Sequence, residues 1–531
     1  MYKGHRVDLL KTCVLTILVS ICSGSLVAQK KADSSAGSQT ASERRTEAGL
    51  TVARKDPLAL RAFLVTMPKG ADLHNHLSGA VYAESFIRAA VEDDLCVDTA
   101  SDSFAKPQSL PDTPQGQPVC GNGKVPAAQA LKSQHLYDAL VNAFSMRSFV
   151  PSSGVSGHDH FFDTFGKFSG TDVRHTGEWL DEVATRAASQ NEQYLELMAT
   201  PTAPHLSSIV REAGWNDDLR QQRETLLAHG LRDDLPAARA YWDQAEATRK
   251  QREHCGAANE QLACKVEARY IYQVSRGNPK EQVFAQALLG FEVAKADPRV
   301  VGINFVQPED GYTSMTDYAL QMRMVGFLHE VYPEVHISLH AGELAPGLVP
   351  PDGLCCHVRL AVEQAHAERI GHGVDVMYEN HPHELLKEMK AKHVMVEINL
   401  TSNDAILGIR GNDHPLPIYR QFQVPLALST DDEGVSRIDL TNEYVRAVLT
   451  YDLKYRDLKQ MVRTSLEHSF LPGKSLWREP DAFTRTVADC SRDVPGAGKP
   501  SDSCAAFLKS SERAQQQWEL ERRFRAWEAQ H

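Results

Sequence analysis

Past residue 65 the sequence repeatedly places a short apolar or β-branched run, a polar turn and a longer helical stretch in succession. Such alternation is typical of βα units that build a parallel sheet. The runs that qualify as strands are residues 71–76, 194–199, 265–272, 300–306, 336–340, 369–372, 394–399 and 425–430. Their number and order predict an α/β fold, a closed (β/α)8 TIM barrel.

The first 28 residues have the form of a secretory signal peptide. Lys3, Arg6 and Lys11 precede an apolar run at 12–21, and small and polar residues follow at 23–28. This run is about half the roughly 20 residues of a membrane-spanning helix, so a retained membrane helix is the weaker alternative. Residues 29–55, rich in Ser, Ala, Lys and Glu, are expected to form a flexible linker. We expect a secreted or periplasmic protein that is not attached to a membrane once the signal is removed.

Two long stretches interrupt the barrel, which is expected to occupy residues 56–477. Residues 92–130, rich in Asp, Pro, Gly and Ser, indicate an insertion after the first strand. Residues 201–263, with a helical run at 235–252, are expected to form helices beside or above the barrel. Residues 478–531 are expected to be a C-terminal helical extension that ends in a charged helix at 511–530.

The cysteines support an exported protein. The chain has ten, and removal of the signal would leave eight. Three pairs lie close in sequence in Pro-, Gly- or Asp-rich segments, so we expect the disulfides Cys96–Cys120, Cys255–Cys264 and Cys490–Cys504. Scattered buried thiols are the alternative. The adjacent Cys355 and Cys356 could form a disulfide or remain thiols.

The charge balance argues against nucleic-acid binding. The chain has 57 Lys+Arg against 69 Asp+Glu, a formal net charge of -12, and no long basic stripe that could neutralise a phosphate backbone. The sequence also contains no Cys-x-x-Cys, no His-Glu-x-x-His and no Gly-x-Ser-x-Gly. Thiolate zinc knuckles, helix-borne metalloprotease sites and nucleophile elbows therefore have no support.

Reactive side chains gather at the ends of four predicted strands. His74 and His76 alternate in the first strand, so both project from the same face. The others follow three later strands: His340 and Glu343, His372, and Asp431 and Asp432. In a (β/α)8 barrel the C-terminal ends of the strands carry the catalytic residues, so these side chains are expected to converge there.

The residue types suit a hydrolytic metal centre. Three imidazoles and one carboxylate favour zinc, with one position left for water. We expect one Zn2+ per chain, bound by His74, His76, His340 and Asp431. Zinc lowers the pKa of a bound water to near neutrality, and His372 and Asp431 are expected to orient that water and take its proton. Glu343 is expected to stay protonated and to donate to a substrate atom.

Several stretches of sequence carry a family resemblance. They are Lys-Gly-Ala-Asp-Leu-His-Asn-His-Leu-Ser-Gly-Ala at 69–80, His-Ala-Gly-Glu at 340–343, Arg-Ile-Gly-His-Gly at 369–373 and Thr-Asp-Asp at 430–432. In order and spacing they resemble the adenosine deaminase family of metal-dependent hydrolases. The similarity spans about residues 67–475, with further matches at 194–197 and 466–470. The cysteine content and the signal most resemble the extracellular branch of that family.

This resemblance implies a reaction and a role for each residue. Hydroxide would add at C6 of a 6-aminopurine, and ammonia would leave. Glu343 would protonate purine N1, His372 would position and deprotonate the attacking water, and Asp432 would hydrogen-bond purine N7. The zinc ligands would be His74, His76, His340 and Asp431.

Two positions depart from the family pattern on the substrate side. Ser78 stands where many adenosine deaminases have an aspartate that helps to hold ribose. Gln307 stands where a glycine after the fourth strand usually meets purine N3. We expect Ser78 and Gln307 to contact the substrate and to alter ribose recognition. Three aromatic residues resemble family aromatics that line the pocket, with a plain core role as the alternative: Phe161, Phe162 and Phe165.

Other polar residues are expected to be structural. His357 and His366 lie in a helical stretch and are expected on the surface or in the core. His158 and His160 adjoin a Gly- and Ser-rich run and are expected in a loop, and Glu433 is expected to be a solvated cap.

The expected function is a secreted zinc aminohydrolase that converts adenosine, or a close 6-aminopurine nucleoside, to the 6-oxo product (inosine) and ammonia. One alternative is a hydrolase of the same superfamily with a different amine or amide substrate. Another is a catalytically silent barrel that binds a nucleoside or a protein partner. The expected ligand is a small purine nucleoside. The sequence leaves the oligomeric state open, with a homodimer as one option.

Overall fold

The computed structural model describes residues 40–108, 119–152 and 154–531. The predicted signal peptide at 1–28 and the first part of the predicted linker lie outside the described residues. Among the described helices, none has both the length and the apolar character needed to cross a bilayer.

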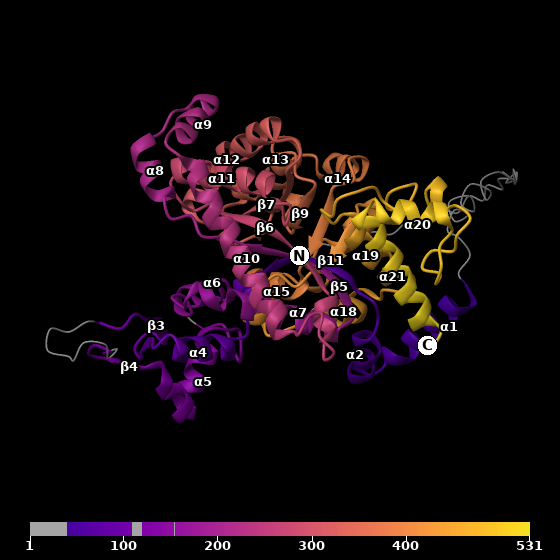
Figure 1. Cartoon of the computed structure of the whole chain (residues 1–531), viewed down its shortest axis with the longest axis horizontal. Helices are drawn as coiled ribbons and strands as arrows, with labels where there is room; N and C mark the ends of the chain where they lie inside the picture. Colours follow the sequence, from indigo (N-terminus) through magenta and orange to yellow (C-terminus); the bar gives the residue numbers. More distant parts are fainter. Residues whose placement is uncertain (1–39, 109–118, 153) are drawn as a thin grey trace, which may run out of the picture. The chain divides into compact units, whose positions relative to one another are not determined.

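Eight parallel strands form one sheet in which neighbours follow the order of the chain (Figure 1). The strands are β1 (Gly70–His76), β5 (Glu192–Ala199), β6 (Glu267–Ser275), β7 (Val300–Val306), β8 (His336–Ala341), β9 (Arg369–His372), β10 (Met395–Ile398) and β11 (Leu426–Leu428). A parallel bridge between Asn75 and Asp431 joins the last strand region back to β1. The predicted (β/α)8 barrel is thus confirmed, and each predicted strand overlaps one that is observed.

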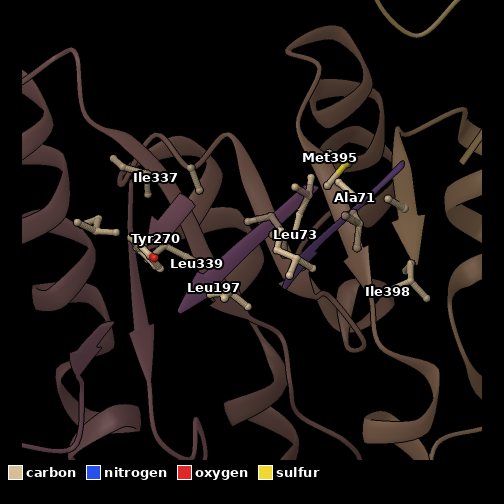
Figure 2. Packing of buried hydrophobic residues seen from close by; sticks show 14 of the residues in the cluster. Ala71, Leu73, Leu197, Tyr270, Ile337, Leu339, Met395 and Ile398 are labelled. Carbon is tan, nitrogen blue, oxygen red and sulfur yellow. The ribbon is translucent and has the colours of Figure 1, made fainter. Parts of the chain in front are cut away.

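The strands are buried on both faces, as expected when helices cover the outside of a barrel. Every residue of β1 and of β5 is buried. Ala71, Leu73 and Leu197 belong to the large buried cluster drawn in Figure 2, together with Ile337 and Leu339 of β8. The alternate residues of β1, His74 and His76, point the other way and approach residues of β8. Strand periodicity therefore places apolar residues in the packed core and imidazoles inside the barrel.

Crossover helices cover the sheet. They include α7 (Thr176–Ser189), α11 (Lys280–Ala296), α12 (Tyr312–Val331), α13 (His357–Glu363), α14 (Pro382–Ala391), α15 (Leu400–Leu407), α16 (Leu416–Phe422), α18 (Leu440–Tyr451) and α19 (Tyr455–Glu467). Helix α11 packs against β6 and β7, and α19 packs against both β11 and β1. Because α19 contacts the first and the last strand, it covers the seam at which the barrel closes.

The stretch after β1 carries a small substructure of its own. Helices α3 (Leu77–Ala80) and α4 (Ala83–Glu92) lead to a three-stranded antiparallel sheet, β3-β2-β4, of β2 (Cys96–Asp98), β3 (Ser103–Ala105) and β4 (Lys124–Pro126). Helices α5 (Gln134–Ala143) and α6 (Gly157–Lys167) follow. A separate buried cluster, which includes Phe86, Val97 and Phe144, holds these elements together.

Further helices flank the barrel. Along the chain, β5 and β6 are separated by helices α8 (Leu206–Ala213), α9 (Leu219–Ala228) and α10 (Leu235–Arg252). The last two helices are α20 (Asp502–Lys509) and α21 (Glu512–Glu528). The three predicted disulfides, Cys96–Cys120, Cys255–Cys264 and Cys490–Cys504, are all present. Cys355 and Cys356 also form a disulfide, a choice that the sequence left open.

The N-terminal segment differs from the expected linker. Residues Ala41–Ala53 form helix α1, which packs with α2 (Pro57–Val65), α19 and α21. The buried residues Thr46, Leu50 and Ala53 are spaced four and three apart, so they share one face of the helix. This apolar face is docked on the barrel helices, and residues 41–53 are therefore ordered rather than a solvated linker.

Candidate active site

Three imidazoles and one carboxylate meet inside the C-terminal end of the barrel. His74 Nε2 lies 3.1 Å from His340 Nε2, and His76 Nε2 lies 3.2 Å from the same atom. Asp431 Oδ1 lies 3.5 Å from His74 Nε2 and 3.2 Å from His76 Nε2. The structure therefore brings together the four predicted metal ligands, which come from β1, β8 and the end of β11.

Backbone geometry positions these ligands. Asp431 N donates to His74 O at 2.9 Å, and His76 N donates to Asp431 O at 3.0 Å. Asp431 adopts a φ of 62°, in the left-handed region that few non-glycine residues occupy. Residues in such conformations concentrate at functional sites, where the surrounding structure holds them in place.

Buried acceptors fix the ring orientation of two of the imidazoles. His74 Nδ1 donates to Glu397 Oε2 at 2.6 Å. His340 Nδ1 lies 2.7 Å from Asn304 Oδ1, which also accepts the backbone N–H of His340 at 3.1 Å. Because Nδ1 carries the proton in both rings, their Nε2 lone pairs are free to bind a metal. His76 Nδ1 lies 2.6 Å from the amide of Gln273, a group that can donate or accept.

Glu397 belongs to a charged network buried in the barrel. Arg369 Nε lies 2.7 Å from Glu397 Oε1, and Arg369 Nη1 lies 2.6 Å from Glu196 Oε2. The neighbouring Arg369 and His74 lower the pKa of Glu397 against the effect of its burial. A charged carboxylate is thus held against Nδ1 of His74, which makes that imidazole a better ligand.

The donor set fits zinc. Ligands at about 2.0–2.1 Å in a tetrahedral site lie about 3.3 Å from one another, close to the separations of these Nε2 and Oδ1 atoms. His74, His340, His372 and Asp431 also form a group whose possible ligand atoms all lie within 4.8 Å of one another. Neutral imidazoles with one carboxylate are the ligand types that zinc prefers.

Glu343 lies beside this centre with no partner for one oxygen. Its side chain is buried, and Oε1 makes no hydrogen bond. Glu309 anchors the turn, because its two oxygens accept the backbone N–H groups of Gly342 at 3.0 Å and Glu343 at 2.8 Å. Burial, with the charges of Asp431 and Glu309, raises the pKa of Glu343 well above its ordinary value. Glu343 is therefore a buried carboxyl whose protonated form is favoured and whose Oε1 is free.

His372 is fully buried at the end of β9. Its Nε2 lies 3.9 Å from Asp431 Oδ2, and its Nδ1 lies 3.4 Å from Glu343 Oε1. Asn403 Nδ2 approaches the same Nδ1 at 2.8 Å. His372 thus lies between Asp431, a candidate metal ligand, and Glu343.

The predicted substrate contacts fall in different places. Asp432 is buried, and its Oδ1 has no hydrogen-bond partner. Ser78 is half-buried one residue before Gly79, whose Cα faces Asp432. Gln307 is exposed, and its Oε1 accepts the backbone N–H of Gly277 at 2.8 Å, so its side chain is held against the turn after β6.

Helix α6 corrects one prediction. His158 and His160, expected in a loop, lie in α6, which begins with a capping box between Ser156 and Asp159. His158 Nε2 contacts Asp310 Oδ1 at 3.0 Å. The α6 aromatics pack in the small cluster after β1, with Phe161 buried and Phe162 and Phe165 partly buried.

One other expectation also changes, that for Glu433. Glu433, expected to be solvated, is buried and pairs with Arg186 Nη1 at 2.9 Å. His357 is buried and donates from Nδ1 to Glu309, so it supports the carboxylate that anchors Glu343. His366 is exposed, in line with a surface role.

The residues that support the ligands were not predicted. Asn304 and Glu397 lie within β7 and β10, Glu309 follows β7, Asn403 lies on α15, and all four are buried and polar. A signal was present for Glu397, because a lone glutamate interrupts the apolar run at 394–398. Unpaired charges are rarely buried, so such a residue indicates a partner inside the barrel.

Comparisons with known proteins identify the family. A family model described as adenosine deaminase matches residues 178–478. An adenosine deaminase of Clostridium perfringens (strain 13 / Type A) is 34% identical over 135 residues, which are 25% of this chain and 37% of that protein. The aminodeoxyfutalosine deaminase of Streptomyces coelicolor is 33% identical over 128 residues, 23% of this chain and 32% of that protein. The chain thus spans about a third of the length of these relatives.

A solved structure shares the fold. The ADAL–IMP complex superposes with a TM-score of 0.50 at 20% identity, and the match covers 78% of this chain and 94% of that one. At this identity the likeness concerns the (β/α)8 architecture alone.

Proposed function

Because this chain belongs to the adenosine deaminase family of metal-dependent hydrolases, we propose that it is a zinc aminohydrolase that deaminates adenosine or a closely related 6-aminopurine nucleoside. The products would be the 6-oxo purine, inosine from adenosine, and ammonia. The observation that carries the proposal is the convergence of His74, His76, His340 and Asp431 beside Glu343.

The metal would be held by His74, His76, His340 and Asp431. When bound, zinc makes water a nucleophile near neutral pH and stabilises negative charge as it develops. His372 and Asp432 lie beside these ligands. They are not assigned to the metal and are left to contact the water and the substrate.

The residues of the chain supply the proton transfers and the orientation. Glu343, held protonated by burial, donates to purine N1, which becomes basic as water adds at C6. His372 and Asp431 would face the attacking water and orient it, and the proton that the water loses would be accepted at this pair. Burial and the charge of Asp431 raise the pKa of Asp432 well above its ordinary value, so its carboxyl, whose Oδ1 is free, donates a hydrogen bond to purine N7. The C6–N bond then breaks, and the amino group leaves as ammonia with one proton of the water. The oxygen on C6 returns its remaining proton to Glu343 as the 6-oxo group forms.

The substrate class is proposed only as far as the purine ring. Ser78 stands where an aspartate that helps to hold ribose was expected. The side chain of Gln307 accepts the backbone N–H of Gly277 and is not placed beside the candidate metal ligands. We therefore propose that the sugar side accepts groups other than plain ribose, which a substrate panel resolves.

We also propose that the protein acts outside the cytoplasm, secreted or in a periplasm. The predicted signal at 1–28 motivates this, and the disulfides Cys96–Cys120, Cys255–Cys264 and Cys490–Cys504 support it, because such bonds persist in oxidising compartments.

The experiment is a panel of purines with zinc measured on the same sample. Adenosine, 2′-deoxyadenosine, adenine, N6-methyladenosine and AMP are incubated with purified protein, and the loss of ultraviolet absorbance and the release of ammonia are followed. Turnover of at least one 6-aminopurine, with about one zinc per chain, supports the proposal. Zinc-loaded protein that releases ammonia only from other amines indicates a different hydrolase. Zinc-loaded protein that binds purines without turnover indicates a silent barrel.

A further inference from the structure

Three imidazoles of the site, those of His74, His340 and His372, differ in what faces their Nδ1 atoms. Glu397 Oε2 faces His74 at 2.6 Å, and Asn304 Oδ1 faces His340 at 2.7 Å. Both partners are acceptors, and the backbone N–H of His340 fixes the orientation of the Asn304 amide. Since Nδ1 then holds the proton, each of these rings presents a bare Nε2 to the centre.

His372 has a different partner. Its Nδ1 lies 2.8 Å from Nδ2 of Asn403, which is a donor. The oxygen and nitrogen of an amide are assigned from their surroundings, so this contact alone would not settle the direction of the hydrogen bond. The direction is settled by His414, on the far side of Asn403.

A backbone group sets the direction of the whole chain of bonds. Leu416 N–H can only donate, and it lies 3.1 Å from His414 Nδ1, which must therefore accept. His414 Nε2 then carries the ring proton and donates to Asn403 Oδ1 at 3.1 Å. With its oxygen turned toward His414, Asn403 presents its amino group to His372 Nδ1.

The surroundings of His414, Asn403 and His372 favour this direction of their hydrogen bonds. His372, Asn403 and His414 are each no more than 2% exposed, so water does not compete for these bonds. Glu343 Oε1 lies 3.4 Å from His372 Nδ1 and makes no hydrogen bond with it. The nearest partner of His372 Nδ1 is therefore the donor Nδ2 of Asn403.

We propose that His414 and Asn403 are positioning residues that hold His372 with its proton on Nε2. In this tautomer His372 donates a hydrogen bond to the attacking water and neither binds the metal nor accepts the proton of that water. His74 and His340 thus differ from His372 in tautomer. The catalytic part of this inference rests on the proposed function, whereas the tautomer itself does not.

The inference changes the path of one proton. The oxygen that forms the bond to C6 must lose a proton, and His372 has no free nitrogen to receive it. Asp431, whose Oδ2 lies 3.9 Å from His372 Nε2, accepts it instead. The proton passes from Asp431 to the departing amino group, and Glu343 supplies the proton at N1. The second proton of the water, on the oxygen now bound to C6, returns to Glu343 as the 6-oxo group forms, so atoms and charges balance across the reaction.

The tautomer can be read without substrate. In zinc-loaded protein labelled with 15N-histidine, correlations between ring nitrogens and ring protons report which nitrogen is protonated, and His372 is assigned by the signals lost in His372→Gln. We expect Nε2 of His372 to carry the proton in the wild type. A proton on Nδ1 would overturn the inference. This result stands even if the panel of purines shows no turnover, so the two proposals fail separately.

Asn403→Asp tests the consequence. A carboxylate accepts from both neighbours, so the proton of His372 moves to Nδ1, as a proton does beside the aspartate of a hydrolytic triad. If His372 must donate, kcat falls at least about 100-fold with KM within about threefold, since a wrong tautomer is costly. If His372 were a base at Nε2, the same change would maintain or raise kcat, and the catalytic part would be refuted.

Two further comparisons separate positioning from damage. His414→Phe removes the donor to Asn403 and lowers kcat, whereas His414→Gln can both accept from Leu416 N–H and donate to Asn403, and it recovers most of the loss. Asn191→Asp makes the same chemical change at the other end of the barrel, where Asn191 Nδ2 donates to Thr66 O at 2.9 Å. Its kcat is expected within about twofold of the wild type. Equal losses in His414→Phe and His414→Gln would contradict the role of His414.

Discussion

The backbone N–H of Asp431 donates to the carbonyl oxygen of His74 at 2.9 Å, so the seam of the barrel closes at two of the candidate metal ligands. Asn75, the residue between His74 and His76, forms the bridge to Asp431. The four ligands therefore converge only when the last strand region reaches the first. Assembly of the metal centre and closure of the fold are one structural event, and metal binding is expected to stabilise the closed barrel.

Glu397→Gln is expected to weaken zinc binding about 10- to 100-fold. Glu397 Oε2 holds His74 Nδ1 at 2.6 Å, and a neutral amide there loses the charge that makes the imidazole a strong ligand. The dissociation constant of zinc, measured by competition with a chelator, checks this expectation.

Glu388→Gln is a matched control, because Glu388 lies on α14 and pairs with Lys392 at 2.7 Å on the surface. Its zinc affinity should equal that of the wild type. Wild-type affinity in Glu397→Gln would show that the His74–Glu397 contact does not support a metal ligand.

Glu343→Gln is expected to lower kcat at least about 100-fold while zinc content stays the same. The amide has nearly the same shape, and the backbone of the turn remains held by Glu309, but no carboxyl proton is left to donate. Turnover and zinc content are measured on one sample. A variant that keeps its zinc and works normally would remove Glu343 from the mechanism.

The barrel and its catalytic rim could be predicted because both depend on patterns of neighbouring residues in the sequence. The alternation of His74 and His76 with apolar neighbours specifies a strand and its inward face within a few residues. The positions of Glu343, His372 and Asp431 after predicted strands then place them at one end of the barrel.

The supporting residues depend on contacts that no local pattern contains. Glu397 is remote in sequence from His74, and Asn403 is recognisable as a partner of His372 only once β9 and α15 are placed side by side. Glu433 looked solvated because its neighbours are charged. Arg186, which lies on α7, explains its burial. Helix α1 was missed because its apolar face is short, and docking against α19 and α21 supplies what its composition does not.

Gly79→Ala is expected to raise KM about tenfold with zinc retained. A Cβ at residue 79 would lie 1.5 Å from Asp432 Oδ1, so the carboxyl group must move away from the position proposed to donate to purine N7. Loss of one hydrogen bond to a ligand has about this effect. Steady-state kinetics and zinc content provide the measurement.

Gly166→Ala is the matched control, because a Cβ there meets nothing within 4 Å on helix α6. Its kinetics should be unchanged, and its stability should rise by about 0.5–1 kcal/mol because alanine restricts the unfolded chain. If Gly79→Ala also left KM unchanged, the proposed contact of Asp432 with N7 would be wrong.

Glu443→Gln is expected to reduce the loss of stability as the pH rises from about 5 to 8. Glu443 on α18 is fully buried, with Thr401 N donating to its Oε2 at 3.1 Å, and burial raises its pKa to about 7 from an ordinary value of 4.5. Between these two values the folded state holds a proton that the unfolded state has released. Stability therefore falls as the pH rises through this window and levels off above about 7, by on the order of 3 kcal/mol.

The uncharged glutamine can still accept the backbone N–H of Thr401, but it does not titrate. Urea unfolding of the wild type and the variant at pH 5, 6, 7 and 8 isolates this effect, because other titrating groups contribute equally to both proteins and cancel in the difference. The variant should gain relative to the wild type as the pH rises, with most of the gain between pH 5 and 7. Parallel stability curves for the two proteins would mean that Glu443 has the same pKa in the folded and unfolded chains.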